Sequence, residues 1–542
     1  MKRLVLSLLL ISGFSYAQNF TKQDTLKGSN TEFRNFWDVK KYDISVEPHF
    51  KEKSLNGSNT IFFEFTKDIT NPIFQIDLQQ PMTTGAIKPS FKIDKNIKRE
   101  GDFIFIQAKG KFLKGQKHSI KINFSGNPKI AKNAPWNGGW QFDTDTKGNP
   151  WMTVTQEGDG TSLWLPLKDI WDDEPDNGIL LNITTQKDLA GVGNGRLISK
   201  KQQGENTVWT WEVKNPINAY SIVPTIGKLI NFKDVYNGEK GKLDLDYWVL
   251  DYNLEKAKKQ FQQVHPMMKA FENWFGPYPF YEDSYKLVET PHLGMEHQSN
   301  VAYGNEYKNG YLGRDLSDTG YGLTWDYIII HETGHEWFAN NITAKDQADM
   351  WIHESFTTYS EVLFVNDFIS KEAGDRYAQG IRGNISNNSA IIGKYGVRNE
   401  GGGDMYPKGA NMIHTIRQII NNDDLFKQIL RGLNKEFYHQ TVNTEQIQDY
   451  IQKRVNFEVK PIFDQYLRQT DIPILEFQQN GKELKFVWKQ TIEGFTMPIR
   501  VKQNNQNINI KPTNSIQTIT LPSDQPIHID KNYYIEYQPT KF

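Results

Sequence analysis

The hydrophobic pattern of the chain changes twice, and these changes limit the folds that it can adopt. From 18 to 252, short apolar runs such as Ile61–Phe65 alternate with turns rich in Gly, Asn, Pro and Lys, which is typical of β-strands. From 253 to 470, apolar residues recur at helical spacing. Glu255–Trp274 is the first such stretch, and Pro266 is expected to kink or restart its helix. Residues 471–542 alternate again, as in Leu484–Trp488. The pattern predicts a multi-domain α+β protein.

The length of the chain agrees with this division, because 542 residues are too many for one hydrophobic core. We expect an N-terminal β domain at 18–252, a helical domain at 253–470 and a small C-terminal β-sandwich at 471–542. The 63 basic and 64 acidic residues give a net charge of −1 without long blocks of one sign. This balance argues against binding to nucleic acid or to an anionic membrane surface.

Residues 1–17 have the features of a Sec signal peptide. Lys2 and Arg3 precede the apolar run Leu4–Phe14, and Ala17 ends a cleavage site before Gln18. A membrane span needs about 20 apolar residues, so this run is too short to be one. We therefore expect a periplasmic or secreted protein with no membrane span after signal removal. Because the chain contains no cysteine, a metal site in it must use His, Asp or Glu.

Residues 331–340 read HETGHEWFAN and contain the strongest chemical pattern in the chain. His331 and His335 are four residues apart, so on a helix they share one face and can offer two imidazoles to one zinc ion. Glu332 then lies beside the metal, where it can take a proton from zinc-activated water. The alternative is that His331 and His335 are two ordinary surface histidines, because the five-residue H-E-x-x-H pattern also occurs by chance.

A third candidate ligand makes the metal site specific. Glu354 follows His335 after eighteen intervening residues, on a second helical stretch. Two imidazoles and one carboxylate leave the fourth zinc position open for water, as in catalytic sites. His353 is an alternative ligand, but it points about a third of a turn away from Glu354 and is interpreted as a helix-face residue. We expect one Zn²⁺ per chain, held by His331, His335 and Glu354.

The stretch HETGHEWFANNITAKDQADMWIHESFTTYSE resembles the gluzincin aminopeptidases of the aminopeptidase N and leukotriene hydrolase type. These enzymes carry H-E-x-x-H, then eighteen residues, then Glu. The resemblance extends over roughly 40–475. It implies a saddle-like N-terminal β domain, a thermolysin-like zinc catalytic domain and a C-terminal β-sandwich. It also implies an aminopeptidase that hydrolyses the first bond of peptides with a free N-terminus.

Residues 293–297, LGMEH, resemble the G-x-M-E-N motif of this family. The glutamate of that motif binds the α-amino group of the substrate, which assigns Glu296 to substrate binding, with Gly294 and Met295 beside it. Leu293 and His297 depart from the motif, because the family has Gly at the first position and usually Asn at the last.

Residues 406–410, YPKGA, resemble the Y-x-K-G-A segment of the family. The tyrosine of that segment stabilises the oxyanion, which assigns this role to Tyr406. Asp404 is expected to cap the helix that begins here and to place Tyr406 in its first turn.

Residues 155–157, TQE, resemble the family's T-Q-x-E segment, which reaches over the cleft. Glu157 comes one residue early and Gly158 occupies the acidic position, so Gln156 is expected to match the substrate-binding role more closely than Glu157. Asp349 and Glu361 also match the family and are expected to orient metal ligands; solvated helix faces are the alternative.

The resemblance implies a mechanism in which Glu332 is the general base, Tyr406 stabilises the oxyanion and Glu296 binds the substrate ammonium. Three other functions remain open. A leukotriene-hydrolase-like epoxide activity would need a basic site that binds a carboxylate. A thermolysin-like endopeptidase would use the same metal site without an ammonium-binding group. A secreted binding protein on an inactive peptidase fold would be expected to have lost some of the catalytic residues. The sequence contains no indication of an oligomeric state.

Overall fold

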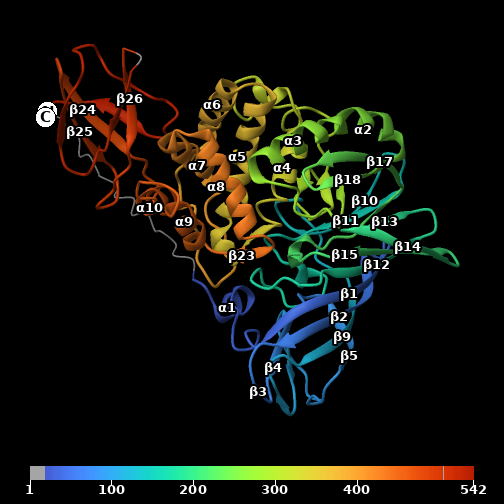
Figure 1. Cartoon of the computed structure of the whole chain (residues 1–542). Helices are drawn as coiled ribbons and strands as arrows, with labels where there is room; N and C mark the ends of the chain where they lie inside the picture. The colour runs from blue at the N-terminus through green and yellow to red at the C-terminus, as the bar shows by residue number, and fades with distance from the viewer. Residues whose placement is uncertain (1–18, 505) are drawn as a thin grey trace, which may run out of the picture.

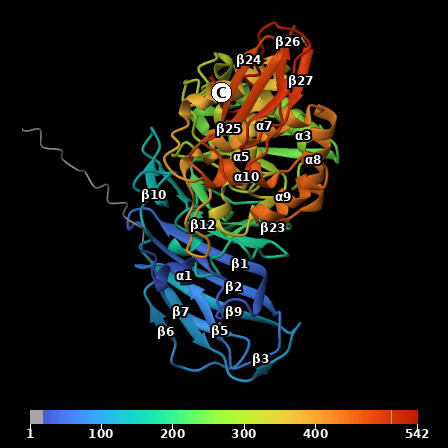
Figure 2. The same ribbon diagram turned by 90° about the vertical axis from the view of Figure 1, so that its left-hand side faces the viewer.

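The computed structural model describes residues 19–504 and 506–542, so the predicted signal peptide at 1–17 lies outside the described residues. Figures 1 and 2 show strands of the N-terminal region at one end of the molecule, helices in the middle and the C-terminal strands at the other end. This arrangement confirms the predicted α+β fold class, with a β-rich N-terminal region, a helical catalytic region and C-terminal sheets.

A seven-stranded sheet forms the body of the N-terminal region. Its strand order is β14-β15-β12-β1-β2-β9-β5, and within it β1 and β12 run parallel while the other neighbours are antiparallel. Alternate residues of β2, including Ile61, Phe63 and Phe65, are buried as the predicted strand requires. The strands are β1 (Trp37–His49), β2 (Ser54–Phe65), β5 (Thr83–Pro89), β9 (Lys117–Gly126), β12 (Ile179–Gln186), β14 (Arg196–Gln203) and β15 (Asn206–Val213).

Smaller sheets complete the N-terminal region. One of them, in the order β10-β11-β16-β13, places the end of β11 at Thr155, so Gln156 and Glu157 leave the sheet directly after that strand. The shorter strands are β10 (Gly139–Thr144), β11 (Pro150–Thr155), β13 (Ala190–Val192), β16 (Thr225–Gly227), β3 (Ile69–Thr70), β8 (Lys111–Phe112), β4 (Ile73–Asp77), β6 (Lys98–Glu100) and β7 (Phe103–Gln107). The segment that precedes all of these strands forms helix α1 (Lys22–Gly28).

A five-stranded mixed sheet joins the β region to the helical region. Its order is β17-β18-β19-β21-β20, with β18 parallel to β19. The strands are β17 (Leu229–Gly238), β18 (Gly241–Leu250), β19 (Tyr285–Glu289), β20 (Gly294–Met295) and β21 (Val301–Tyr303). Side chains of β18 alternate between two cores: Leu245 and Tyr247 face the helical region, whereas Trp248 and Leu250 face the β region.

This pairing corrects the boundary predicted at 252/253. Strands β17 and β18 hydrogen-bond into the sheet that also contains β19 to β21, so by pairing they belong with the region that follows them. An alternating pattern identifies a strand but does not specify which sheet it joins, because the choice depends on partners distant in the sequence.

Nine described α-helices follow the β region. The predicted helix at 255–274 is divided into α2 (Leu254–Gln260) and α3 (Val264–Phe275) by a 3₁₀ turn, and Pro266 lies in the first turn of α3, where it is tolerated. The other helices are α4 (Tyr327–Gly334), α5 (Trp351–Phe368), α6 (Lys371–Gly380), α7 (Pro407–Ile420), α8 (Asp423–Glu436), α9 (Thr444–Gln452) and α10 (Lys460–Arg468); two short parallel strands, β22 (Ile342–Ala344) and β23 (Gln440–Val442), lie among them. In the part of the chain that the structure describes, no helix is both long and apolar enough to cross a bilayer.

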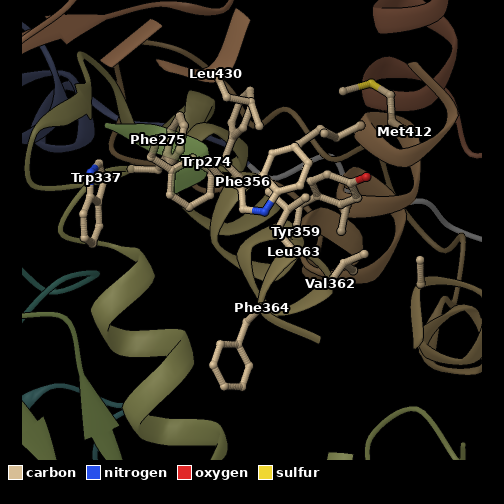
Figure 3. Close-up of a cluster of buried hydrophobic side chains, with 14 of the residues drawn as sticks. Trp274, Phe275, Trp337, Phe356, Tyr359, Val362, Leu363, Phe364, Met412 and Leu430 are labelled. Atoms are coloured by element: carbon tan, nitrogen blue, oxygen red, sulfur yellow. The ribbon is translucent and has the colours of Figure 1, made fainter. Parts of the chain in front are cut away.

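Helix α5 is the centre of this helical region, because 15 of its 18 residues are buried. Figure 3 shows its aromatic and aliphatic side chains packed among residues of neighbouring helices, including Trp274 of α3, Met412 of α7 and Leu430 of α8. A helix that is buried on all sides cannot slide or rotate without disrupting close packing. Residues carried by α5 are therefore held firmly in place.

The C-terminal strands form two sheets, as predicted for a small β-sandwich. One sheet has the order β28-β25-β24-β30 and the other β27-β26-β29. Leu484, Phe486 and Trp488 of β25 are buried, in agreement with their alternating spacing. The strands are β24 (Ile474–Asn480), β25 (Glu483–Lys489), β26 (Ile499–Gln503), β27 (Gln506–Ile510), β28 (Gln517–Thr520), β29 (His528–Ile529) and β30 (Glu536–Pro539).

Candidate active site

Helix α4 carries the first two candidate ligands, and Asp326 determines where it begins. The Asp326 side chain accepts hydrogen bonds from the backbone N–H groups of Ile328 and Ile329, as an N-cap does. It also accepts a hydrogen bond of 2.7 Å from the Tyr303 hydroxyl, which ties the helix start to β21. From Ile328 to Gly334 every residue of this helix is buried. His335 ends the helix as its C-cap, so the four-residue spacing still brings both imidazoles to one face.

Helix α5 brings Glu354 to the same point. The Nε2 atoms of His331 and His335 lie 3.6 and 3.4 Å from Glu354 Oε2. One ligand atom from each of the three residues lies within 4.8 Å of the other two. The close packing of α4 and α5 depends on Gly334, because a Cβ atom there would lie 2.5 Å from Ser360 Oγ.

The outer nitrogen atoms of both imidazoles are already occupied. His331 Nδ1 lies 2.7 Å from Glu361 Oε1, and His335 Nδ1 lies 3.1 Å from the Phe338 carbonyl oxygen. A proton on each Nδ1 satisfies these acceptors and leaves each Nε2 lone pair directed at Glu354. Carboxylate and carbonyl partners of this kind orient histidine ligands in metal proteins. Glu361 is therefore placed to orient His331, which is the role that the sequence predicts for it.

The donor set fits a zinc ion. Glu354 Oε2 is buried and has no hydrogen-bond partner, which is unfavourable for a carboxylate unless another ligand satisfies it. Burial alone would raise the pKa of Glu354, but the positive charges of His335 and His331 in their protonated forms hold it well below its usual range. A bound cation would take the place of these protons. Two neutral imidazoles and one ionised carboxylate are the ligands of many catalytic zinc sites.

Glu332 faces the same space from α4. Burial raises the pKa of Glu332 to about 7, although the His331 imidazole acts in the opposite direction. Strand β20 passes very close to this carboxylate, because a Cβ atom on Gly294 would lie 2.7 Å from Glu332 Oε1. Gly294 is therefore required by the close approach of the strand, and Glu332 is held beside the three candidate ligands.

These residues line a cavity of about 380 Å³. Of the residues predicted for the site, the cavity brings together Glu157, Gly294, Met295, Glu296, His331, Glu332, His335, Glu354 and Tyr406. Glu296 is 3% exposed and its Oε1 atom has no hydrogen-bond partner; Glu157 Oε1 is likewise buried and unpartnered. Burial and the nearby Glu296 carboxylate raise the pKa of Glu157 well above its usual value. The two carboxylates form a site that a cation would satisfy.

The relative order expected for Gln156 and Glu157 is corrected by the structure. The Gln156 amide donates to the Tyr220 and Ile222 carbonyls at 2.9 and 2.8 Å, and its oxygen accepts from the Trp164 indole at 2.7 Å. Gln156 is 1% exposed and is not among the residues that line the cavity. Successive residues of an extended segment point in opposite directions, so Glu157 rather than Gln156 faces the cavity.

Tyr406 lies on the cavity wall and is 37% exposed. Its ring stacks against that of His331, with centroids 6.1 Å apart. Desolvation, followed by the charge of Glu354, raises the pKa of Tyr406 well above its usual value. The hydroxyl therefore stays protonated and can donate a hydrogen bond.

The expected cap of α7 is incorrect. Tyr406 itself occupies the N-cap position and Pro407 begins the helix. The Asp404 carboxylate instead accepts a hydrogen bond of 2.8 Å from the Ser386 backbone N–H. Asp404 therefore anchors the preceding loop, and the orientation of Tyr406 depends on that tertiary contact.

Three other residues singled out from the sequence lie outside the cavity or away from the candidate ligands. His353 Nε2 accepts a 2.9 Å hydrogen bond from the Ala344 backbone N–H, so it is directed away from the candidate ligands. Asp349 accepts a 2.7 Å hydrogen bond from the Tyr395 hydroxyl and does not orient a ligand. His297, where the motif departs from the family, is 1% exposed and does not line the cavity.

Two residues that hold Glu296 in place were not found from the sequence. Asn340 Nδ2 donates to the Glu296 carbonyl oxygen at 2.8 Å and to Glu336 Oε1 at 3.3 Å. Glu336 also accepts hydrogen bonds from Tyr278 and from the backbone of Ser299. Glu336 follows His335 directly in the sequence, so the sequence does show that it lies next to the motif. Its partners are distant in the chain, so the sequence does not show what it binds.

Comparison with known proteins agrees with this geometry. Residues 259–466 match the Peptidase family M1 domain. The probable aminopeptidase 2 of Sulfurisphaera tokodaii is 20% identical over 463 residues, which are 82% of this chain and 55% of that protein. Mouse (Mus musculus) aminopeptidase B is 24% identical over 46% of this chain and 38% of its own length. The chain thus spans about half or less of the length of these two relatives.

Solved structures share the fold. The M1 zinc metallopeptidase from Deinococcus radiodurans has a TM-score of 0.69 and 18% identity, covering 82% of this chain and 96% of that one. A mutant of that peptidase bound to a Tyr-Ser-Ala substrate also has a TM-score of 0.69, with 17% identity, and covers 82% and 98% of the two chains. At this level of identity the likeness shows the fold alone.

The geometry predicts that metal binding requires His335. In His335→Ala the remaining two ligands cannot complete a three-donor site, so purified protein should contain little zinc by elemental analysis while its circular dichroism stays native. His265→Ala, which changes a partly exposed histidine paired with Asp234, is the control and should retain one zinc per chain. Full zinc occupancy in His335→Ala would rule out this ligand set.

Proposed function

Because the chain belongs to peptidase family M1, the family of gluzincin aminopeptidases, we propose that it is a zinc-dependent aminopeptidase acting on peptides with a free N-terminus. One observation carries the proposal: the unpartnered carboxylate atoms of Glu296 and Glu157 share a cavity with the three candidate zinc ligands. A substrate ammonium bound there would present the first peptide bond to the ligand set. Neither an endopeptidase nor a binding protein needs this pair of carboxylates.

The proposed chemistry needs an activated water and a stabilised oxyanion. When bound to His331, His335 and Glu354, zinc supplies Lewis-acid chemistry, which acidifies water and polarises a carbonyl group. Glu332 accepts the proton of the attacking water and delivers it to the leaving amine. A pKa near 7 suits both transfers, because the same carboxyl group must first accept a proton and then donate it. Bound zinc would lower this pKa and favour the base form at the start.

Tyr406 performs the second task. Its hydroxyl, kept protonated by desolvation and by the charge of Glu354, donates a hydrogen bond to the oxygen that gains negative charge during attack. A donor that is already oriented at this oxygen stabilises the transition state more than the ground state. The position of Tyr406 as the N-cap of α7 restricts its backbone and supports this role.

Glu296 and Glu157 bind and orient the substrate. An α-ammonium between them forms charge-assisted hydrogen bonds, which are shorter and stronger than neutral ones. It also relieves the repulsion between two carboxylates in a desolvated cavity. Asn340 donates to the Glu296 carbonyl oxygen. Glu336 accepts hydrogen bonds from Asn340 and from the backbone N–H of Ser299 in the same segment. These contacts keep the Glu296 backbone in position.

We further propose that the protein is exported. The observation is the signal-like segment 1–17, which lies outside the described residues. Expression of the full chain in a bacterial host, followed by cell fractionation and N-terminal sequencing, tests this proposal. Mature protein in the periplasm or medium should begin at Gln18, and a cytosolic product that keeps residue 1 would contradict export.

The catalytic roles predict that chemistry can be lost without loss of metal. Glu332→Gln keeps the side-chain shape but removes the base, so kcat should fall by at least about 100-fold. Tyr406→Phe should lower kcat by roughly 100 to 1,000-fold, because one oxyanion donor is lost. Both variants should retain one zinc per chain by elemental analysis. Wild-type kcat in either variant would remove that residue from the mechanism.

The ammonium site predicts discrimination between a peptide and its N-acetylated twin. Acetylation removes a charge-assisted contact of about 1.5–3 kcal/mol, so kcat/KM should be roughly 10 to 150-fold higher for the free amine. Glu296→Gln should lose most of this preference, whereas Glu493→Gln, an exposed change in the C-terminal sandwich, should keep it.

Other results would favour the alternative functions. Internal cleavage of the acetylated peptide at a rate similar to the free peptide would identify a thermolysin-like endopeptidase. Zinc-loaded protein that cleaves neither peptide nor a panel of aminoacyl substrates would favour a binding protein on a peptidase fold.

A further inference from the structure

The proposed active-site cavity contains more negative charge than the proposed reaction needs. Six carboxylates line it, and among the described residues that line it there is no lysine or arginine. These carboxylates belong to Glu157, Asp159, Glu296, Glu332, Glu354 and Glu400. A zinc ion and one substrate ammonium together carry three positive charges, which are fewer than the six carboxyl groups of the lining. The buried, unpartnered Oε1 atom of Glu296 shows that the lining is directed at a ligand and is not satisfied within the protein.

Four of the six carboxylates have a role in the proposed mechanism, but Asp159 and Glu400 do not. Glu400 lies on the loop that precedes α7. Glu400 is an exposed residue of the lining. Desolvation by the cavity wall, then the charges of Glu354 and Asp159, raise the pKa of Glu400, and no basic group acts on it in the opposite direction. Its charge is therefore not compensated by the protein.

The basic side chains behind this wall act on Asp159 but not on Glu400. Desolvation lowers the pKa of Lys27, and the charge of Asp159 is among the smaller causes that raise it, whereas no basic group shifts the pKa of Glu400. Arg398, two residues before Glu400, turns away from the cavity and pairs with Asp169 at 3.2 Å, with both side chains buried. Lys27 of α1 lies beside the same pair, outside the cavity. The backbone that carries Glu400 is thus anchored by a buried ion pair, while Glu400 itself faces the cavity.

Trp136 forms an aromatic wall beside these carboxylates. It is 63% exposed, the highest value among the large exposed hydrophobic residues, and it lines the same cavity. Its loop is tied to Asp159, because the Gly138 backbone N–H donates to Asp159 Oδ2 at 2.8 Å. An indole face next to carboxylates is a favourable environment for a guanidinium or an alkylammonium group, by cation–π and charge-assisted contacts.

We propose that this cavity selects peptides whose first residue is arginine or lysine, with the cationic side chain bound between Trp136, Asp159 and Glu400. The proposal rests on the proposed function and specifies its substrate class. The first residue is favoured over the second because Asp159 is two residues from Glu157, one of the carboxylates assigned to the α-ammonium. A long basic side chain extending from that residue reaches this wall of the cavity.

The test uses the zinc-loaded full protein and substrate pairs that differ only in charge. Fluorogenic amides of arginine and citrulline form one pair, and those of lysine and norleucine form the other. We expect kcat/KM to be at least about 10-fold higher for the charged member of each pair, and the advantage to shrink in 1 M salt. Glu400→Gln and Trp136→Ala should each lower the arginine-to-citrulline ratio at least about threefold. Glu493→Gln is the matched control and should leave the ratio unchanged.

The outcomes separate this inference from the proposed function. If citrulline and norleucine amides are hydrolysed as fast as their charged partners, the selectivity is overturned and the aminopeptidase proposal stands. A ratio unaffected by Glu400→Gln and Trp136→Ala overturns the assigned residues. An advantage seen only for dipeptide amides with arginine at the second position overturns the assignment to the first residue. If none of the amides is hydrolysed, the proposed function itself fails.

Discussion

Glu354 lies between two imidazoles in the interior, and its Oε2 atom is within 3.6 Å of both Nε2 atoms. A buried carboxylate is tolerated only when charges or ligands compensate it, so this contact governs the surrounding structure. Helix α5 carries Glu354 and is buried among the other helices, and Gly334 allows α4 to approach it closely. Glu361 and the Phe338 carbonyl fix the outer side of each imidazole. Together these contacts give a preorganised three-donor site.

The rest of the site is assembled from segments far apart in the chain. Glu157 comes from the end of β11, Glu296 follows β20 and Tyr406 is the N-cap of α7. Contacts between the β region and the helical region hold these segments together. The buried Arg398–Asp169 pair links the loop before α7 to the N-terminal region, and Gln347 donates to the Glu157 carbonyl at 2.9 Å. The cavity therefore depends on how the two regions pack against each other.

The electrostatics of the cavity connect structure to the proposed substrate. Repulsion among desolvated carboxylates costs stability in the absence of ligands, and a group that binds only the folded state recovers it. Zinc, a substrate ammonium and a basic side chain would each supply positive charge at a different part of the wall. On this view the same excess of negative charge positions the metal, selects a free N-terminus and favours a cationic first residue.

Local spacing by itself determined the β–helix–β order of the chain. It also marked His331, Glu332, His335 and Glu354 as candidate site residues, because four-residue periodicity and ligand chemistry are properties of short segments. Family resemblance added Glu296 and Tyr406, both of which line the cavity. Tertiary structure decided the rest. It turned Gln156 inward and Glu157 toward the cavity, gave Asp404 a loop to anchor in place of a helix to cap, and joined β17 and β18 to the second sheet. Each of these outcomes depends on a partner far away in the chain, and neither periodicity nor motif spacing carries information about such partners.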